Sequence, residues 1–180
     1  MVNDAIARSQ WCLFVIAALL ATATAIGCSM RPHPIVAHYD SPADHVDWMP
    51  PCTPERPLPQ TGFCRGTGHS TTPTTLTGDW QGVSEYAYGW LALPSGVTFT
   101  DNLETFTGTV AGCGSGSMTY WMHAREDEHG NISAEWSIVD GFGGGDLTRA
   151  RGHGTLTGVF REHDLTSSGE FRGWIHCRAR

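Results

Sequence analysis

The sequence predicts an all-β protein: a small antiparallel β-barrel of about eight strands, preceded by an irregular Pro-rich segment. From Asp79 onward, apolar and polar residues alternate in short runs rich in Thr, Tyr, Trp, Val and Ile, as in half-buried strands. Gly, Asp, Asn and Ser separate these runs, and no long stretch shows a helical period. The composition agrees, since Gly is frequent (22 residues) and only 16% of residues are charged.

Residues 1–27 have the pattern of an export signal. A polar start with Arg8 precedes the apolar run "WCLFVIAALLATATAIG", which ends in small residues. The end of this run, "TAIGC", resembles a bacterial lipobox, in which Cys28 would be acylated and become the mature N-terminus. Ala25 stands where Leu is usual, and "ATA" just upstream is an acceptable conventional cleavage site. We therefore expect an exported protein, anchored to the membrane through a lipid on Cys28 or else secreted.

Residues 28–75 contain most of the prolines and many Thr residues, so we expect a tether that carries a disulfide loop rather than a packed core. The barrel domain is then expected over residues 76–180. Its predicted strands lie in the runs at 79–93, 103–110, 117–125, 132–139, 154–160 and 169–177. "EDEHGN" and "LTSSGE" are typical of hairpin turns.

Four cysteines remain once Cys12 in the signal and Cys28 are set aside: Cys52, Cys64, Cys113 and Cys177. An even number in an exported chain indicates two disulfides, with three pairings open. A local bridge between Cys52 and Cys64 is plausible, and Cys113 would then join Cys177. No C-x-x-C pair or His motif with ligand spacing occurs, so no metal site is predicted.

The stretch "GCGSG" at residues 112–116 raises three interpretations: a phosphate-binding loop, a cysteine nucleophile, or a bent strand. The chain has no Lys, which a phosphate-binding loop of the usual kind needs, and no helix follows. Export makes a bridged Cys113 more plausible than a catalytic one. We therefore expect a bent strand whose glycines let another group approach closely.

The net charge is −7, with 18 acidic residues against 11 basic ones that are all Arg. An acidic chain with scattered Arg has no electrostatic footprint for nucleic acid, so no nucleic-acid partner is predicted.

Three stretches, "FTGTVAGCGSGSMTY", "AEWSIVDGFGGGDLTRARGHGTLTG" and "GEFRGWIHC", resemble the allene oxide cyclase-like (dirigent-like) barrel proteins of bacteria. The resemblance covers about residues 78–178 and rests on glycines and turns, such as Gly143, Gly145, Asp146 and Gly154. It implies an eight-stranded barrel whose cavity takes an apolar ligand. Members that catalyse do so mainly by confining a reactive substrate.

Aromatic residues are the best candidates for lining a ligand cavity: Trp80, Tyr88, Trp90, Trp121, Trp136, Phe142 and Trp174. Glu85 and Glu135 are weak candidates for an acid or base, with a solvent-facing position as the favoured alternative. Bulky residues on both strand faces also fit a homo-oligomer interface.

The sequence favours a binding protein for a hydrophobic small molecule, with no cofactor. The alternatives are a cofactor-free cyclase or isomerase, and a structural or protein-interaction lipoprotein of the cell envelope. Export weighs against the enzyme, because biosynthetic cyclases usually work in the cytoplasm.

Overall fold

The protein is an antiparallel β-barrel, seen in a computed structural model that describes residues 32–53 and 62–177. Ten strands are present in these residues. They are β1 (His33–Ser41), β2 (Asp44–Trp48), β3 (Cys64–Ser70), β4 (Thr74–Gly78), β5 (Trp80–Ala92), β6 (Thr98–Val110), β7 (Gly114–Glu126), β8 (Asn131–Gly145), β9 (Arg151–Arg161) and β10 (Thr166–His176). Within the described part of the chain, no helix is long and apolar enough to cross a bilayer.

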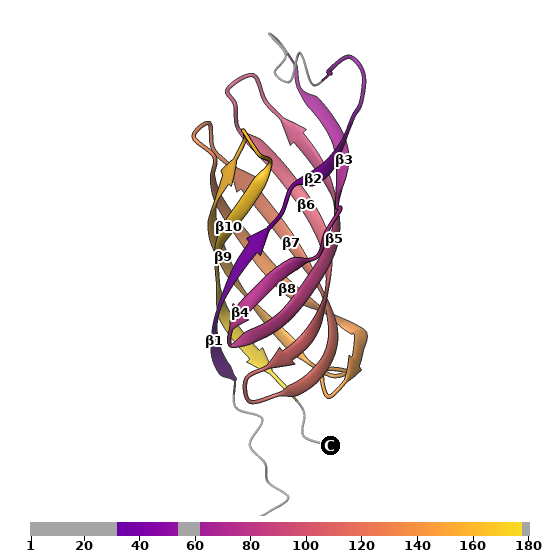
Figure 1. Ribbon diagram of the computed structural model, residues 1–180, viewed down its shortest axis with the longest axis vertical. Helices are drawn as coiled ribbons and strands as arrows, with labels where there is room; N and C mark the ends of the chain where they lie inside the picture. The colour runs from indigo at the N-terminus through magenta and orange to yellow at the C-terminus, as the bar shows by residue number, and fades with distance from the viewer. Residues whose placement is uncertain (1–31, 54–61, 178–180) are drawn as a thin grey trace, which may run out of the picture. The chain divides into compact units, whose positions relative to one another are not determined.

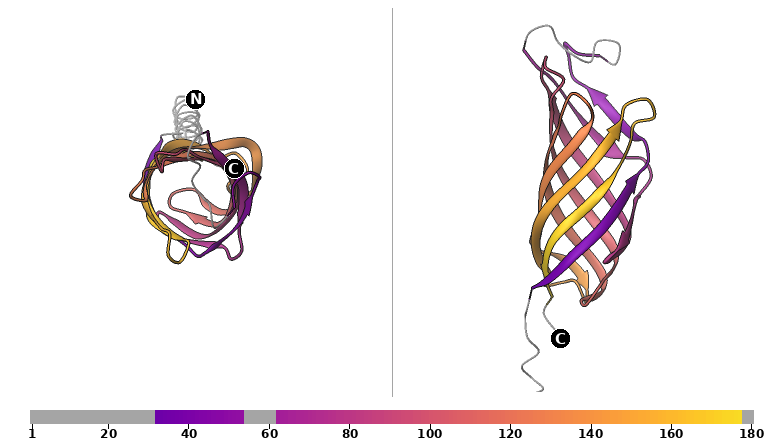
Figure 2. Two further views of the ribbon diagram at one scale, coloured as in Figure 1. Left: turned by 90° about the horizontal axis from the view of Figure 1, so that it is seen from above. Right: turned by 90° about the vertical axis from the view of Figure 1, so that its left-hand side faces the viewer.

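Eight of the strands form the closed ring, in the order β5-β4-β1-β10-β9-β8-β7-β6, and β6 pairs with β5 to complete it (Figure 2, left). The other two strands, β2 and β3, extend the sheet at one end of the barrel. The lower half of β5 pairs with β4, whereas its upper half pairs with β3, which in turn pairs with β2. We call the end with the β7–β8 and β9–β10 turns the upper end, as in Figure 1. The all-β barrel predicted from the sequence is confirmed.

The expectation of an irregular tether over residues 28–75 is wrong for much of that segment, because β1, β2, β3 and the start of β4 form there. β1 carries "HPIVAHYDS", and its inward residues Ile35, Ala37 and Tyr39 are buried. The prolines lie where strands tolerate them: Pro34 near the start of β1, Pro42 between β1 and β2, and Pro73 between β3 and β4. The high proline content therefore did not indicate a linker, since Pro42 and Pro73 lie at the bends between consecutive strands.

The lower interior is a solid aromatic core. Trp80 is completely buried, and its ring centroid lies 5.2–5.7 Å from those of Phe106, Tyr120, Trp136 and Phe171. The β8–β9 connection closes the lower end, because Leu147 and Ala150 are buried against this core.

Glycines on neighbouring strands make room for the large rings. A Cβ on Gly154 would lie 2.8 Å from Cζ2 of Trp136, and one on Gly173 would lie 2.6 Å from the same atom. These two glycines face each other across β9 and β10. Phe106 lies over Gly82 and Gly108 on β5 and β6 in the same way.

Both disulfides form, between Cys52 and Cys64 and between Cys113 and Cys177. The second ties the β6–β7 turn to the end of β10 across a sequence separation of 64 residues. On chain-entropy grounds, closing a loop of that length stabilises the fold by about 4 kcal/mol.

The "GCGSG" stretch is structural, as expected. A Cβ on Gly116 would lie 2.0 Å from the carbonyl oxygen of Gly144, so backbone fills the space that its missing side chain leaves.

Replacing Gly154 with Ala should lower the free energy of unfolding by about 2–3 kcal/mol, because the new methyl group overlaps the Arg172 carbonyl and the Trp136 ring. Gly89→Ala is the matched control, since a Cβ on this exposed β5 residue meets nothing within 4 Å. Urea unfolding measures both variants. Equal stability of the two variants would contradict the proposed role of Gly154.

Candidate functional site

The interior changes character towards the upper end, where polar side chains replace the aromatic core. β5 and β6 turn Ser84, Tyr86, Asn102 and Glu104 inward, beginning at Ser84, which is paired with Phe106. Their registers bring them together, because Tyr86 is paired with Glu104 and Glu104 with Tyr120. The residues of this upper cluster are Ser41, Asp44, Thr74, Ser84, Tyr86, Tyr88, Asn102, Glu104 and Tyr120.

Glu104 is the centre of the upper cluster. Its side chain is buried, and its Oε2 accepts hydrogen bonds from Tyr120 Oη at 2.6 Å and from Ser84 Oγ at 3.2 Å. The other oxygen, Oε1, has one long contact, 3.5 Å from Nδ2 of Asn102. Burial raises the pKa of the Glu104 carboxyl, and these hydrogen bonds oppose that shift only in part.

Asn102 contains an unsatisfied acceptor. The residue is only 8% exposed, and its Oδ1 has no hydrogen-bond partner among the described residues. A buried polar atom in this condition costs about 1–3 kcal/mol, so it calls for an explanation. The nearby indole N–H of Trp90 is also buried without a partner.

A second chain of hydrogen bonds links the upper cluster to β1, β2 and β4. Tyr86 Oη donates to Asp44 Oδ1 at 2.5 Å and lies 2.7 Å from Ser41 Oγ, which accepts from Thr74 Oγ1 at 3.0 Å. The Asp44 carboxyl group also interacts with the side chain of Tyr88. Burial raises the pKa of Asp44 although both tyrosines oppose this shift, and it also raises the pKa of each tyrosine.

Glu126 adds a third inward carboxyl group at the upper end of β7. Burial, followed by the charges of Glu162 and Asp127, raises the pKa of Glu126 to about 7. Every described Arg side chain is exposed, and none of the described salt bridges involves Asp44, Glu104 or Glu126. The upper interior is therefore rich in acceptors and acidic, with no cation of the described chain bound to it.

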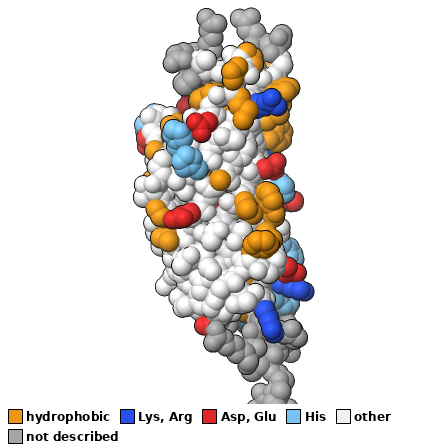
Figure 3. Space-filling view, turned by 90° about the vertical axis from the view of Figure 1, so that its right-hand side faces the viewer, with side chains coloured by type: hydrophobic (Ala, Val, Ile, Leu, Met, Phe, Trp, Pro, Cys, Tyr) orange, Lys and Arg blue, Asp and Glu red, His pale blue; other side chains and the backbone are white. Residues whose placement is uncertain are grey.

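The seven aromatic residues predicted to line a cavity do not lie together. Trp80 and Trp136 are core residues, whereas Tyr88 and Trp90 lie in the upper interior near Trp48. Trp121, Phe142 and Trp174 are on the outer surface, with exposed fractions of 43%, 66% and 49%. Because these three side chains are exposed on the outer surface, they cannot line the interior of the barrel. On the face in Figure 3, apolar side chains form separate groups rather than one band.

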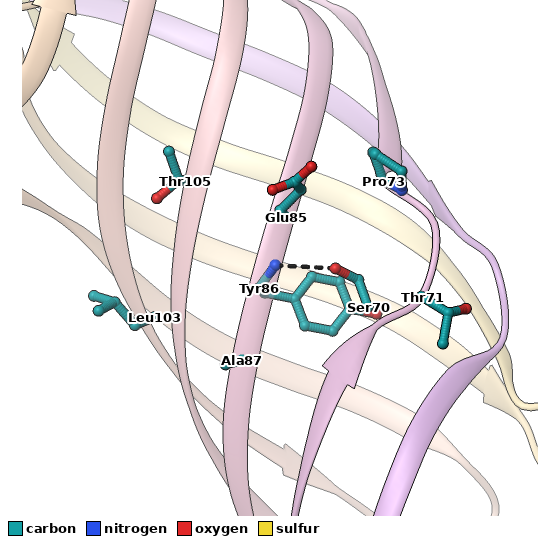
Figure 4. A pocket seen from close by; sticks show the side chains of 8 residues that line it. All are labelled: Ser70, Thr71, Pro73, Glu85, Tyr86, Ala87, Leu103 and Thr105. Carbon is teal, nitrogen blue, oxygen red and sulfur yellow. Dashed lines mark hydrogen bonds between the residues drawn. The ribbon is translucent and has the colours of Figure 1, made fainter.

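Glu85 and Glu135 both point outward and are exposed, the solvent-facing position that the sequence favoured. Glu85 does border a surface hollow of about 360 Å³ at the bend between β3 and β4 (Figure 4). In that hollow the backbone N–H of Tyr86 donates to Ser70 Oγ at 3.2 Å. Within the described residues, no group of three or more His, Cys, Asp or Glu side chains is placed to hold a metal ion.

The sequence reasoning missed Asn102, Glu104 and Asp44. The signal for two of them was present, since the alternation of Phe106, Gly108 and Val110 places Glu104 and Asn102 on the same face when it is extended backwards. Asp44 was missed because its segment was assigned to the tether.

Residues 52–166 match the family model described as "Protein of unknown function (DUF3224)", which is more than half of the chain. The chain belongs to the DUF3224 family. The DUF3224 match begins at Cys52, so β1 and β2 lie outside it, although β1 is one of the eight strands of the ring.

A solved structure shares the fold. It is a protein with unknown function from the DUF3224 family of Shewanella oneidensis MR-1, determined at 1.84 Å resolution. It matches this chain with a TM-score of 0.56 at 12% identity, covering 83% of this chain and 100% of its own. No curated protein matches the chain. The resemblance to allene oxide cyclase-like barrels stays a prediction.

The raised pKa of Glu126 predicts a pH dependence of stability. The folded state holds the proton more tightly than the unfolded state, so this contribution is complete below about pH 4.5 and is lost as the pH rises through about 7. Glu126→Gln should flatten the fall in melting temperature between pH 5 and about pH 8. Glu128→Gln, on the same turn and exposed, is the control. Identical pH profiles for the wild type and Glu126→Gln would contradict the prediction.

Proposed function

We propose that the protein is an exported, lipid-anchored barrel that binds a small molecule with an apolar body in the upper part of its interior. One observation carries the proposal: the buried acceptor of Asn102 has no partner in the described protein. Buried acceptors are normally satisfied, and a bound molecule would satisfy this one.

The two ends of the barrel differ in a way that supports a single upper site. The lower interior is filled by Trp80 and its neighbours and closed by Leu147. The upper interior has aromatic walls from Tyr88 and Trp90, and Tyr88 is only half-buried. Ligand sites commonly combine such apolar walls with a few convergent polar groups.

Export is supported by two features that do not depend on each other. Residues 1–27 have the pattern of a signal sequence, and the two disulfides fit an oxidising compartment. Cys28 lies outside the described residues, so the lipid anchor rests on the sequence alone.

Native mass spectrometry of protein purified from its own host tests the binding site. The wild type should carry a bound small molecule, and Ala124→Trp should lose it, because Ala124 faces the upper interior. Arg125→Trp, on the adjacent outward position, is the control and should retain the ligand. A wild type that carries no small molecule, and whose melting temperature no apolar compound raises, would contradict the proposal.

Labelling with radioactive palmitate tests the anchor. The wild type and Cys12→Ala should be labelled, because Cys12 lies inside the signal. Cys28→Ala should lose the label, and unchanged labelling of this variant would exclude the lipobox.

A further inference from the structure

The upper cluster holds two neighbouring oxygen atoms that can still accept hydrogen bonds. Asn102 Oδ1 has no partner among the described residues, and Glu104 Oε1 has only the 3.5 Å contact with Asn102 Nδ2. Turning the Asn102 amide would place its oxygen against an oxygen of the ionised Glu104 carboxylate, so the ionised form of Glu104 favours the present orientation. A molecule that binds here must therefore donate hydrogen bonds.

The carboxyl groups around the upper cluster restrict which chemical class of hydrogen-bond donor would bind there. Three carboxyl groups, Asp44, Glu104 and Glu126, lie on the inward side of the upper end. None of them pairs with a described Arg. Burial disfavours the charged form of all three carboxyl groups, and a protonated amine would stabilise that form. A neutral alcohol would satisfy Asn102 alone, and an anionic ligand would disfavour the charged carboxylates further.

We infer that the ligand carries a protonated amine, which Asn102 Oδ1 and the Glu104 carboxyl group bind while Asp44 contributes charge. This inference rests on the proposed function and adds the chemical class of the ligand. An ammonium group has three donors, so it can donate both to Asn102 Oδ1 and to Glu104 Oε1. The apolar body of the ligand would contact the rings of Tyr88 and Trp90.

The aromatic residues nearby are suited to the same cation. The rings of Tyr86 and Tyr88 have centroids 6.0 Å apart on β5, and Trp90 follows two residues later on the same face. Ring faces attract organic cations, most strongly where water is excluded. The site therefore combines carboxyl groups, an amide oxygen and aromatic rings, which together favour an amine attached to an apolar or aromatic body.

Three probes of the same shape separate the possibilities: 2-phenylethylamine, 2-phenylethanol and phenylacetate. Isothermal titration calorimetry with the folded protein, in about 0.15 M salt to screen surface charges, measures each dissociation constant. We expect the amine to bind at least about ten times more tightly than the alcohol, and phenylacetate not to bind.

Variants locate the binding. Asn102→Ala and Glu104→Gln should each weaken amine binding about tenfold or more, whereas Glu135→Gln, an outward carboxyl on β8, should leave it unchanged. Ala124→Trp should abolish it. The comparison of the three probes on the wild type needs no variant, so it holds even if Glu104→Gln does not fold.

The outcomes distinguish this inference from the proposed function. If the alcohol binds as tightly as the amine and Ala124→Trp blocks both, the barrel binds a small molecule but the amine inference is wrong. If amine binding is the same in Ala124→Trp, the amine binds on the outer surface and the inference is overturned. If none of the three probes binds at millimolar concentration, the inference fails, and the mass spectrometry above then decides the proposed function alone.

Discussion

The packing of large aromatic rings on glycines of neighbouring strands is the constraint on which the barrel depends. A ring of eight strands leaves an interior that side chains must fill. Trp136 lies against Gly154 and Gly173, and Phe106 lies against Gly82 and Gly108. Each ring therefore fills the space in which a side chain at the two neighbouring glycine positions would otherwise lie. Because Trp80 packs on both of these rings, the lower interior behaves as one unit.

Aromatic rings also lie over glycines at the upper end, but there they do not fill the interior, and this difference leaves the candidate site polar. Tyr88 and Trp90 lie over Gly68 and Gly66 of β3, so they are held against one wall instead of filling the centre. The centre is left to short or polar side chains such as Asn102. Burying Glu104 there is unfavourable for its charged form, and Tyr120 compensates with a short hydrogen bond. Burying these polar groups makes this part of the interior less stable than an apolar core of the same size would be.

The strands from Asp79 onward could be predicted from the sequence, because period-two alternation depends only on which side chains face the core. This is why observed strands overlap all the predicted runs, at 79–93, 103–110, 117–125, 132–139, 154–160 and 169–177. The segment before Asp79 could not be assigned from its composition, since prolines at strand bends resemble those of a linker. The site was missed for a related reason: alternation tells which side faces inward but not at what height along the barrel. Trp80 at the lower end fills the core, whereas Tyr88 at the upper end lies against one wall. Both occupy the same face of β5, so alternation alone does not distinguish them.

The described chain enters and leaves the barrel at one end. His33 is paired with Ile175, and the disulfide from Cys113 to Cys177 lies beside them (Figure 1). An attachment made through either terminus would therefore hold the barrel by its closed base. The acidic upper end would therefore point away from the point of attachment. A C-terminal fusion for immobilising the protein would use the same geometry to keep the upper end accessible.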